Sequence, residues 1–200
     1  MERRLRILDA AERCIVRAGF HRTTMQDVAA EAGMSPGNLY RYFSSKDAIV
    51  AGLAERDRAQ VVGDFSTLAD SSDFMRSLAE LGRKHLSEEP RARAILCLEI
   101  WAEATRNEAF TQITADFDRA MTGRIVELFR RAQGRGEIPP GIDVEAAATV
   151  ISIMADGLYV RRAISRKFDA DREVGHVLAV IEAMMKGAID LEKRAGEMVS

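Results

Sequence analysis

The segment 23–46 constrains the fold of this chain most, because start and stop signals for two short helices follow one another closely within it. Thr23 can cap the first helix with its hydroxyl, and Gln26, three residues later, can reach back to complete a capping box. Gly33 suits the left-handed backbone conformation at which many helices end. The pattern therefore predicts a short helix that stops in a tight turn.

A second short helix follows this turn and is predicted to span 36–42. Ser35 supplies an N-cap, and Pro36 presets the first helical residue. Gly37 and Asn38 lie at its N-terminal end, where no bulky side chain keeps the backbone from a surface and the Asn amide can both donate and accept hydrogen bonds. Such a helix end fits the major groove of DNA, so the segment is predicted to be a DNA-binding helix-turn-helix.

The charge distribution agrees with a polyanionic partner at this end of the chain. Residues 1–46 contain eight Lys or Arg and five Asp or Glu, a net charge of +3. The remainder carries 21 basic and 26 acidic residues, a net charge of −5, so the total of −2 conceals the asymmetry. A merely solvated basic face would have the same charge, and the helix-turn-helix spacing is what favours DNA over that alternative.

Composition excludes several other classes of protein. Two hundred residues, of which 47% are apolar, suffice for one large or two small domains with a real core. The longest apolar runs are far shorter than the roughly 20 residues that cross a bilayer, and no secretory signal precedes the first predicted helix. Cys14 and Cys97 have no motif spacing, which favours a reducing compartment. We therefore expect a cytoplasmic protein without membrane association.

Helical spacing of apolar residues continues along nearly the whole chain, and no strand pattern is found. We expect an all-α protein of about nine helices. It should consist of a three-helix DNA-binding domain at 1–46 and a larger helical domain at 47–200. A helix that begins near Ser45 or Lys46 is expected to leave the first domain and enter the second.

The helix-turn-helix and its flanks carry a recognisable set of residues. They are Gly19, Phe20, Thr23, Thr24, Val28, Ala29, Ala32, Gly33, Gly37, Leu39, Tyr40, Tyr42, Phe43 and Lys46. Through these residues the first fifty positions resemble the TetR family of transcriptional regulators. The stretches Ile100–Ala104 and Ala155–Leu158 are similar to the C-terminal domain of BetI-type members. The resemblance implies a repressor that a small, mainly apolar effector releases from a palindromic operator, with neither cofactor nor metal.

The resemblance also implies which residues contact DNA. Tyr40, Tyr42 and Lys46 match positions that hold backbone phosphates in the family, and such contacts position a protein without specifying sequence. Thr24 and Ser35 are further phosphate candidates, because helix N-termini present free N–H groups to anions.

The bases should be contacted by the start of the second short helix. Gly37 and Asn38 are the expected base contacts, and Met25 and Pro36 offer apolar surface to thymine methyl groups. A dimer would place two such helices roughly 34–36 Å apart, so the operator should be close to palindromic.

The last two helices, expected at about 143–165 and 171–195, carry regular apolar stripes that are wider than one packing partner covers. Family members pair these helices across a two-fold axis, which implies a homodimer; packing within a monomer is the alternative. The predicted interface residues are Ile151, Met154, Leu158, Val177, Ile181, Met184 and Ala188.

A small-molecule effector is expected between the helices of the second domain. Candidate pocket residues are large or soft and apolar, although ordinary core packing would explain each of them singly. They are Phe65, Met75, Leu78, Cys97, Trp101, Phe117, Met121, Met154 and Tyr159. Because Glu99 and Glu103 lie near the single tryptophan in sequence, a cationic ligand is a further possibility, in line with choline-sensing relatives.

Three other functions compete with this interpretation. An all-helical enzyme is disfavoured because His21, His85 and His176 are scattered and show no metal-ligand spacing. A DNA-binding regulator could instead sense thiol oxidation at Cys97 or Cys14, although neither has a motif neighbour. A purely architectural DNA binder would discriminate little between sequences.

Overall fold

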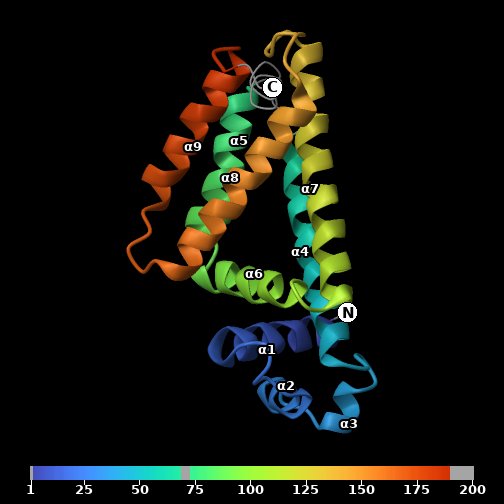
Figure 1. Cartoon of the computed structure of the whole chain (residues 1–200). Helices are drawn as coiled ribbons and strands as arrows, with labels where there is room; N and C mark the ends of the chain where they lie inside the picture. The colour runs from blue at the N-terminus through green and yellow to red at the C-terminus, as the bar shows by residue number, and fades with distance from the viewer. Residues whose placement is uncertain (1, 69–72, 190–200) are drawn as a thin grey trace. The chain divides into compact units, whose positions relative to one another are not determined.

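The computed structural model describes residues 2–68 and 73–189, and all regular structure within these ranges is helical (Figure 1). The all-α prediction is confirmed. The α-helices are α1 (Glu2–Ala18), α2 (Met25–Glu31), α3 (Pro36–Leu39), α4 (Lys46–Leu68), α5 (Phe74–Arg83), α6 (Arg91–Ala104), α7 (Glu108–Gly134), α8 (Val144–Ile164) and α9 (Ala170–Met185). A π-helical turn, η1 (Lys84–Glu88), continues α5.

The helices divide into two compact units that do not follow the predicted boundary between residues 46 and 47. The N-terminal unit combines residues 1–60 with 90–117, and the C-terminal unit combines 61–89 with 118–200. The difference arises because α6 and the start of α7 pack with the N-terminal helices. Leu96 and Phe110 are fully buried in the same apolar cluster as residues of α1, α2 and α4.

The core of the N-terminal unit is made of the inward faces of short helices. Ile7, Ile15, Val28, Leu39 and Leu53 are all at most 1% exposed. They belong to one apolar cluster, so their burial fixes the α2–turn–α3 unit on α1 and α4. Figure 1 shows α1 with α2 and α3 beneath it.

The N-cap of α2 differs from the prediction by one residue, whereas the N-cap of α3 is the predicted one. Thr24, rather than Thr23, caps α2, and Asp27 completes the capping box. Thr23 is 2% exposed, and its hydroxyl donates to the carbonyl of Gly19 at 2.9 Å. Ser35 accepts from the N–H of Asn38, as predicted for α3, which however ends at Leu39.

The core of the C-terminal unit lies among α5, α7, α8 and α9. Phe129, Ala132 and Ile138 are at most 1% exposed, and α8 and α9 each present one buried face to them or to each other. Asp143 and Asp169 cap α8 and α9 by accepting backbone N–H groups. The last helix was predicted to reach residue 195, but α9 ends at Met185 and residues 186–189 form a turn. The rest of the predicted helix, 190–195, lies outside the described residues.

Candidate nucleic-acid interface

The N-terminal end of α3 is exposed and sterically open. Ser35, Pro36 and Gly37 are exposed, and a Cβ added to Gly37 would meet nothing within 4 Å. Asn38 is partly exposed, while its backbone N–H is held by the Ser35 cap at 3.4 Å. Gly33 adopts a φ of +67°, the left-handed conformation predicted for the turn. The turn therefore presents a helix end that a flat or grooved surface can approach closely.

The predicted contacts around α2 are partly engaged within the protein. The Asp27 carboxylate accepts from the Thr24 N–H at 2.8 Å and from its hydroxyl at 2.6 Å. These hydrogen bonds from Thr24 lower the pKa of Asp27 below its usual range. Met25 is half-buried against the core. The Asp27 carboxylate thus already accepts hydrogen bonds at the start of α2. The N-terminal end of α3 is therefore the more open of the two.

The two tyrosines after α3 have different surroundings. Tyr40 is 54% exposed, whereas Tyr42 is half-buried against the N-terminal core. The predicted role of both tyrosines as phosphate contacts stays a prediction, and Tyr40 has the larger accessible surface.

Lys46, predicted to hold a phosphate, is directed inward. Its ammonium donates to the carbonyls of Phe20 at 2.5 Å and Thr23 at 2.9 Å, and it lies 4.0 Å from the centroid of the Phe20 ring. Burial lowers the pKa of Lys46. The side chain therefore fastens the start of α4 to the turn between α1 and α2, and its phosphate role stays a prediction.

Carboxylates of α6 reach the same turn. The N–H of Phe20 donates to Oε2 of Glu99 at 2.9 Å, and Nε2 of His21 lies 2.8 Å from Oε2 of Glu103. Glu103 is 6% exposed, one of few charged residues so deeply placed among the described residues. The Phe20 ring packs edge-on against Phe110 at a centroid distance of 4.9 Å. The α1–α2 turn is thus held by backbone, charge and ring contacts together.

Two family models match this chain, one in its N-terminal part and one over most of the remainder. Residues 7–53 match the model described as bacterial regulatory proteins of the tetR family, and residues 76–186 match that of the BetI-type transcriptional repressor C-terminal domain. The chain belongs to the TetR family. It is therefore a DNA-binding transcriptional regulator, and the helix-turn-helix formed by α2 and α3 lies within the segment that matches the N-terminal family model.

Curated relatives and solved structures agree with the TetR assignment. The chain is 27% identical to the HTH-type transcriptional regulator UidR of Escherichia coli K12, over 78% of this chain and 79% of UidR. It is 26% identical to BetI of Rhizobium meliloti, over 81% and 78% of the two chains. These relatives are regulators of transcription rather than enzymes.

Two solved structures share the fold over most of their length. GusR of Salmonella enterica superposes with a TM-score of 0.80 at 26% identity, covering 92% of this chain and 96% of GusR. A transcriptional regulator of Saccharomonospora viridis, solved in complex with choline, superposes with a TM-score of 0.75 at 28% identity, covering 90% and 96%.

Residues predicted to line the effector pocket of this TetR-family chain are divided between the units. Those in the N-terminal unit are Cys97, Trp101 and Phe117, and those in the C-terminal unit are Phe65, Met75, Leu78, Met121, Met154 and Tyr159. Within the C-terminal unit, Met75 and Met154 pack against the apolar cluster that contains the buried Leu78. Tyr159 packs against the neighbouring cluster around Leu86 and Leu158.

The predicted dimer-interface residues largely face their own subunit. Ile151, Leu158, Ile181 and Met184 are between 2% and 7% exposed in the single chain, so almost no surface remains for a partner. The interface prediction is corrected for these four. Of the other three, Met154 and Val177 are half-buried, and Ala188 is exposed. The apolar spacing on α8 and α9 correctly indicates a buried face, but that face packs within the subunit. The most regular apolar face of a helix is usually the one that faces its own core.

An acidic pair that the sequence analysis missed lies on α7 and α8. The Asp156 side chain keeps contact with solvent, yet the protein around it and the nearby Asp118 raise its pKa from an ordinary 3.8 to about 6. One helical turn away on each helix, the hydroxyls of Thr122 and Ser152 are 3.0 Å apart. Asp118 and Asp156 are far apart in sequence, so no local sequence pattern indicated that they lie close together.

The two cysteines differ in accessibility. Cys14 is 1% exposed, and burial raises the pKa of its thiol, so the reactive thiolate is disfavoured. Cys97 is partly exposed. Thiol sensing at Cys14 therefore has little physical support. Among the residues that the structure describes, no group of three or more His, Cys, Asp or Glu is placed to hold a metal ion, and no helix is long and apolar enough to span a membrane.

Proposed function

We propose that this TetR-family regulator is a sequence-specific repressor that binds a palindromic operator as a homodimer and is released by a small, mainly apolar effector. The observation that carries the proposal is the open N-terminal end of α3. Gly37 allows close approach of the backbone, and the Asn38 amide beside it can pair with a base edge. An architectural DNA binder would not need such an end, because it discriminates little between sequences.

A second subunit is supported by apolar surface on the C-terminal unit. On α8, Ile153 is 65% exposed and Ile164 67%, and Gly157 lies between them on the same face. On α9, Val180 is 42% exposed. We call these four residues the α8–α9 stripe. Large apolar side chains so exposed are costly in water, and a second copy of the chain is the occupant that a two-fold DNA-binding regulator requires.

The effector class is supported by the half-buried methionines and by one relative. Met75 and Met154 can adapt their shape to a ligand. The Saccharomonospora viridis regulator, 28% identical, was solved with choline. The methyl surface of a quaternary ammonium group suits such adaptable apolar side chains. The acidic neighbours of Trp101 add no support for a cationic ligand, because Glu99 accepts the Phe20 N–H and Glu103 lies against His21.

Selection of bound DNA from a random library by the purified protein tests the operator proposal. Enrichment of one consensus with two-fold symmetry is the expected result. An Asn38→Ala variant should then lose preference at specific positions of each half-site, by about 1–3 kcal/mol for a bidentate base contact. Recovery of unenriched DNA would overturn sequence-specific binding and favour the architectural alternative.

Titration with choline tests the effector proposal, with quenching of Trp101 fluorescence and release of the selected operator as the two readouts. The matched control ligand is 3,3-dimethylbutanol, which has the shape of choline without its charge. Release by choline alone would identify a cationic effector, and release by both an apolar one. Operator binding that withstands both ligands would contradict effectors of this shape.

A further inference from the structure

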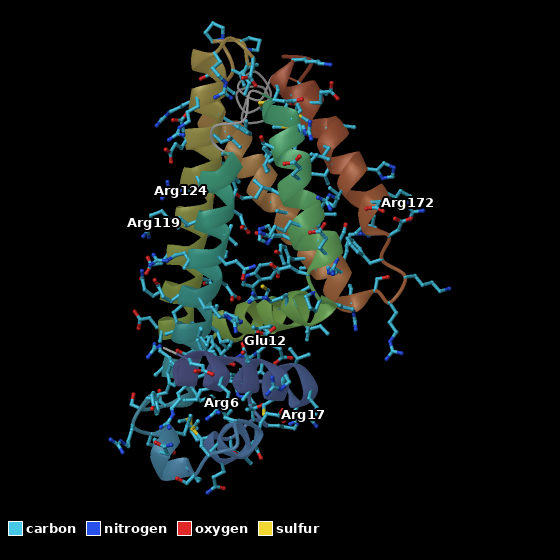
Figure 2. The ribbon with its side chains drawn as sticks, turned by 180° about the vertical axis from the view of Figure 1, so that it is seen from behind. Arg6, Glu12, Arg17, Arg119, Arg124 and Arg172 are labelled. Carbon is cyan, nitrogen blue, oxygen red and sulfur yellow. The ribbon has the colours of Figure 1, made fainter. Side chains whose placement is uncertain are left out.

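Arginines around the helix-turn-helix differ in whether their charge is already matched by an acid. Arg13 and Arg17 both pair with Glu31, at 2.7 and 3.2 Å. These hydrogen bonds lower the pKa of Glu31, so the carboxylate stays charged and keeps both arginines. Figure 2 shows Arg17 on the side of α1 where α2 lies, and Glu12 on the opposite side. Neither Arg13 nor Arg17 offers an unmatched charge to DNA.

Four other arginines of the unit have no acidic partner among the described residues. Among the described residues, none places a carboxylate within ion-pair distance of Arg3, Arg4, Arg6 or Arg41, and all four are exposed. Three of them stand within the first two turns of α1, where the helix dipole disfavours positive charge. Positive charges that oppose the helix dipole and have no acidic partner are unfavourable in the protein alone. A bound anion would make the electrostatic energy of these arginines favourable.

Arg4 is held in place beside the helix-turn-helix. Its guanidinium carbon lies 4.4 Å from the centroid of the Phe43 ring. Phe43 follows α3 by four residues and is 3% exposed. Its ring packs so closely on Gly52 that a Cβ added there would lie 2.9 Å from it. A guanidinium stacked on a fixed ring keeps its N–H groups at the edge of the stack, where they can donate to a phosphate.

Arg41 is a second unpaired arginine close to α3 in sequence. It lies two residues before Phe43 in the exposed turn that follows α3. Lys46, by contrast, directs its ammonium at two backbone carbonyls. The positive charge available next to α3 therefore comes from arginines rather than from that lysine.

We propose that Arg4, stacked on Phe43, and Arg41 form a phosphate-binding pair that fixes the orientation of α3 on the DNA backbone. This inference rests on the proposed operator binding and assigns two positioning residues beyond those predicted from sequence. Contacts of this kind add affinity for every DNA sequence and none for a particular one.

The test is the salt dependence of binding to a short duplex of mixed sequence, followed by fluorescence anisotropy between about 50 and 200 mM KCl. Each phosphate contact contributes a slope of about −0.9 in log K against log salt, so removal of one arginine from both subunits of a dimer should reduce the slope by about 1.8. Arg4→Ala and Arg41→Ala should each show this reduction, and Arg4→Lys should recover most of it because the charge is kept.

Arg13→Ala is the matched control, since that arginine is exposed on the same helix and paired with Glu31; its slope should equal that of the unchanged protein. Circular dichroism confirms that each variant is folded. Slopes of Arg4→Ala and Arg41→Ala equal to the control would overturn the phosphate-binding pair. If the unchanged protein itself bound the duplex without salt dependence, DNA binding as proposed would fail instead.

Discussion

The two compact units satisfy their surfaces in different ways. In the N-terminal unit the polar groups at the α1–α2 turn meet partners within the chain: Glu99 accepts a backbone N–H, Glu103 pairs with His21, and Lys46 donates to two carbonyls. In the C-terminal unit the α8–α9 stripe stays exposed, and burial together with Asp118 raises the pKa of Asp156. The polar groups of the α1–α2 turn therefore find their partners within the chain, whereas α8 and α9 leave large apolar side chains exposed.

Charges introduced into the α8–α9 stripe should have the largest effect, because they would prevent a partner from covering this apolar surface. Ile153→Asp together with Ile164→Asp would bury unpaired carboxylates in a dimer, which is strongly unfavourable. We expect a monomer by sedimentation and a loss of about 100-fold or more in operator affinity, because two linked heads bind far more tightly than one. Ala115→Asp, at an exposed position of α7, is the control and should leave the dimer intact. A dimer that survives both substitutions would place the interface elsewhere.

A methyl group at Gly52 should destabilise the N-terminal unit, where the polar groups of the α1–α2 turn already have partners. An added Cβ would lie 2.9 Å from the Phe43 ring and 3.1 Å from Leu8, so Gly52→Ala should lower the free energy of unfolding by about 1–3 kcal/mol. Gly63→Ala, in the same helix with nothing within 4 Å, should instead raise it by about 0.5–1 kcal/mol. Urea denaturation measures both. Equal effects of the two substitutions would mean that the packing around Phe43 is loose.

The α6 contact should contribute less than this packing. Glu99→Ala removes the acceptor of the Phe20 N–H and should cost about 1–3 kcal/mol if water cannot replace it, towards the lower end because Glu99 is partly exposed. Glu99→Gln keeps an acceptor oxygen and should cost little. Hydrogen exchange at the Phe20 amide is the direct measurement, and unchanged protection in Glu99→Ala would show that this contact holds nothing in place.

The acidic pair should give the smallest effect, and one that depends on pH. The pKa of Asp156 is raised in the folded protein, so this carboxyl binds its proton more tightly folded than unfolded, and stability falls as pH rises from about 4 to about 6. Asp156→Asn should therefore raise the melting temperature at pH 7 and lose that advantage by about pH 4. An advantage that is constant with pH would exclude charge as its cause.

Local signals in the sequence predicted the elements well. Gly33 ends the turn with positive φ, Ser35 caps α3, and α4 begins at Lys46, because each of these depends on a few neighbouring residues. The α2 cap was misplaced by one position. Two adjacent threonines offer the same hydroxyl, and only the burial of Thr23 decides that Thr24 is the cap.

Properties that depend on distant contacts were not predictable in the same way. Regular apolar spacing on α8 and α9 indicates a buried face, but does not say whether the subunit or a partner buries it, and Ile151 and Ile181 proved to be in the subunit core. The inward direction of Lys46 depends on carbonyls more than twenty residues away. The platform that Phe43 offers to Arg4 likewise joins positions that no local pattern relates.

Membership of α6 in the N-terminal unit decides where this regulator can be cut and rejoined. A hybrid that takes residues 1–46 from this chain and the rest from another TetR-family member would separate Phe20 and His21 from Glu99 and Glu103. A hybrid in which 90–117 travels with 1–60, or whose recipient offers matching carboxylates, should keep the α1–α2 turn in its present surroundings. The portable module of this protein is discontinuous in sequence.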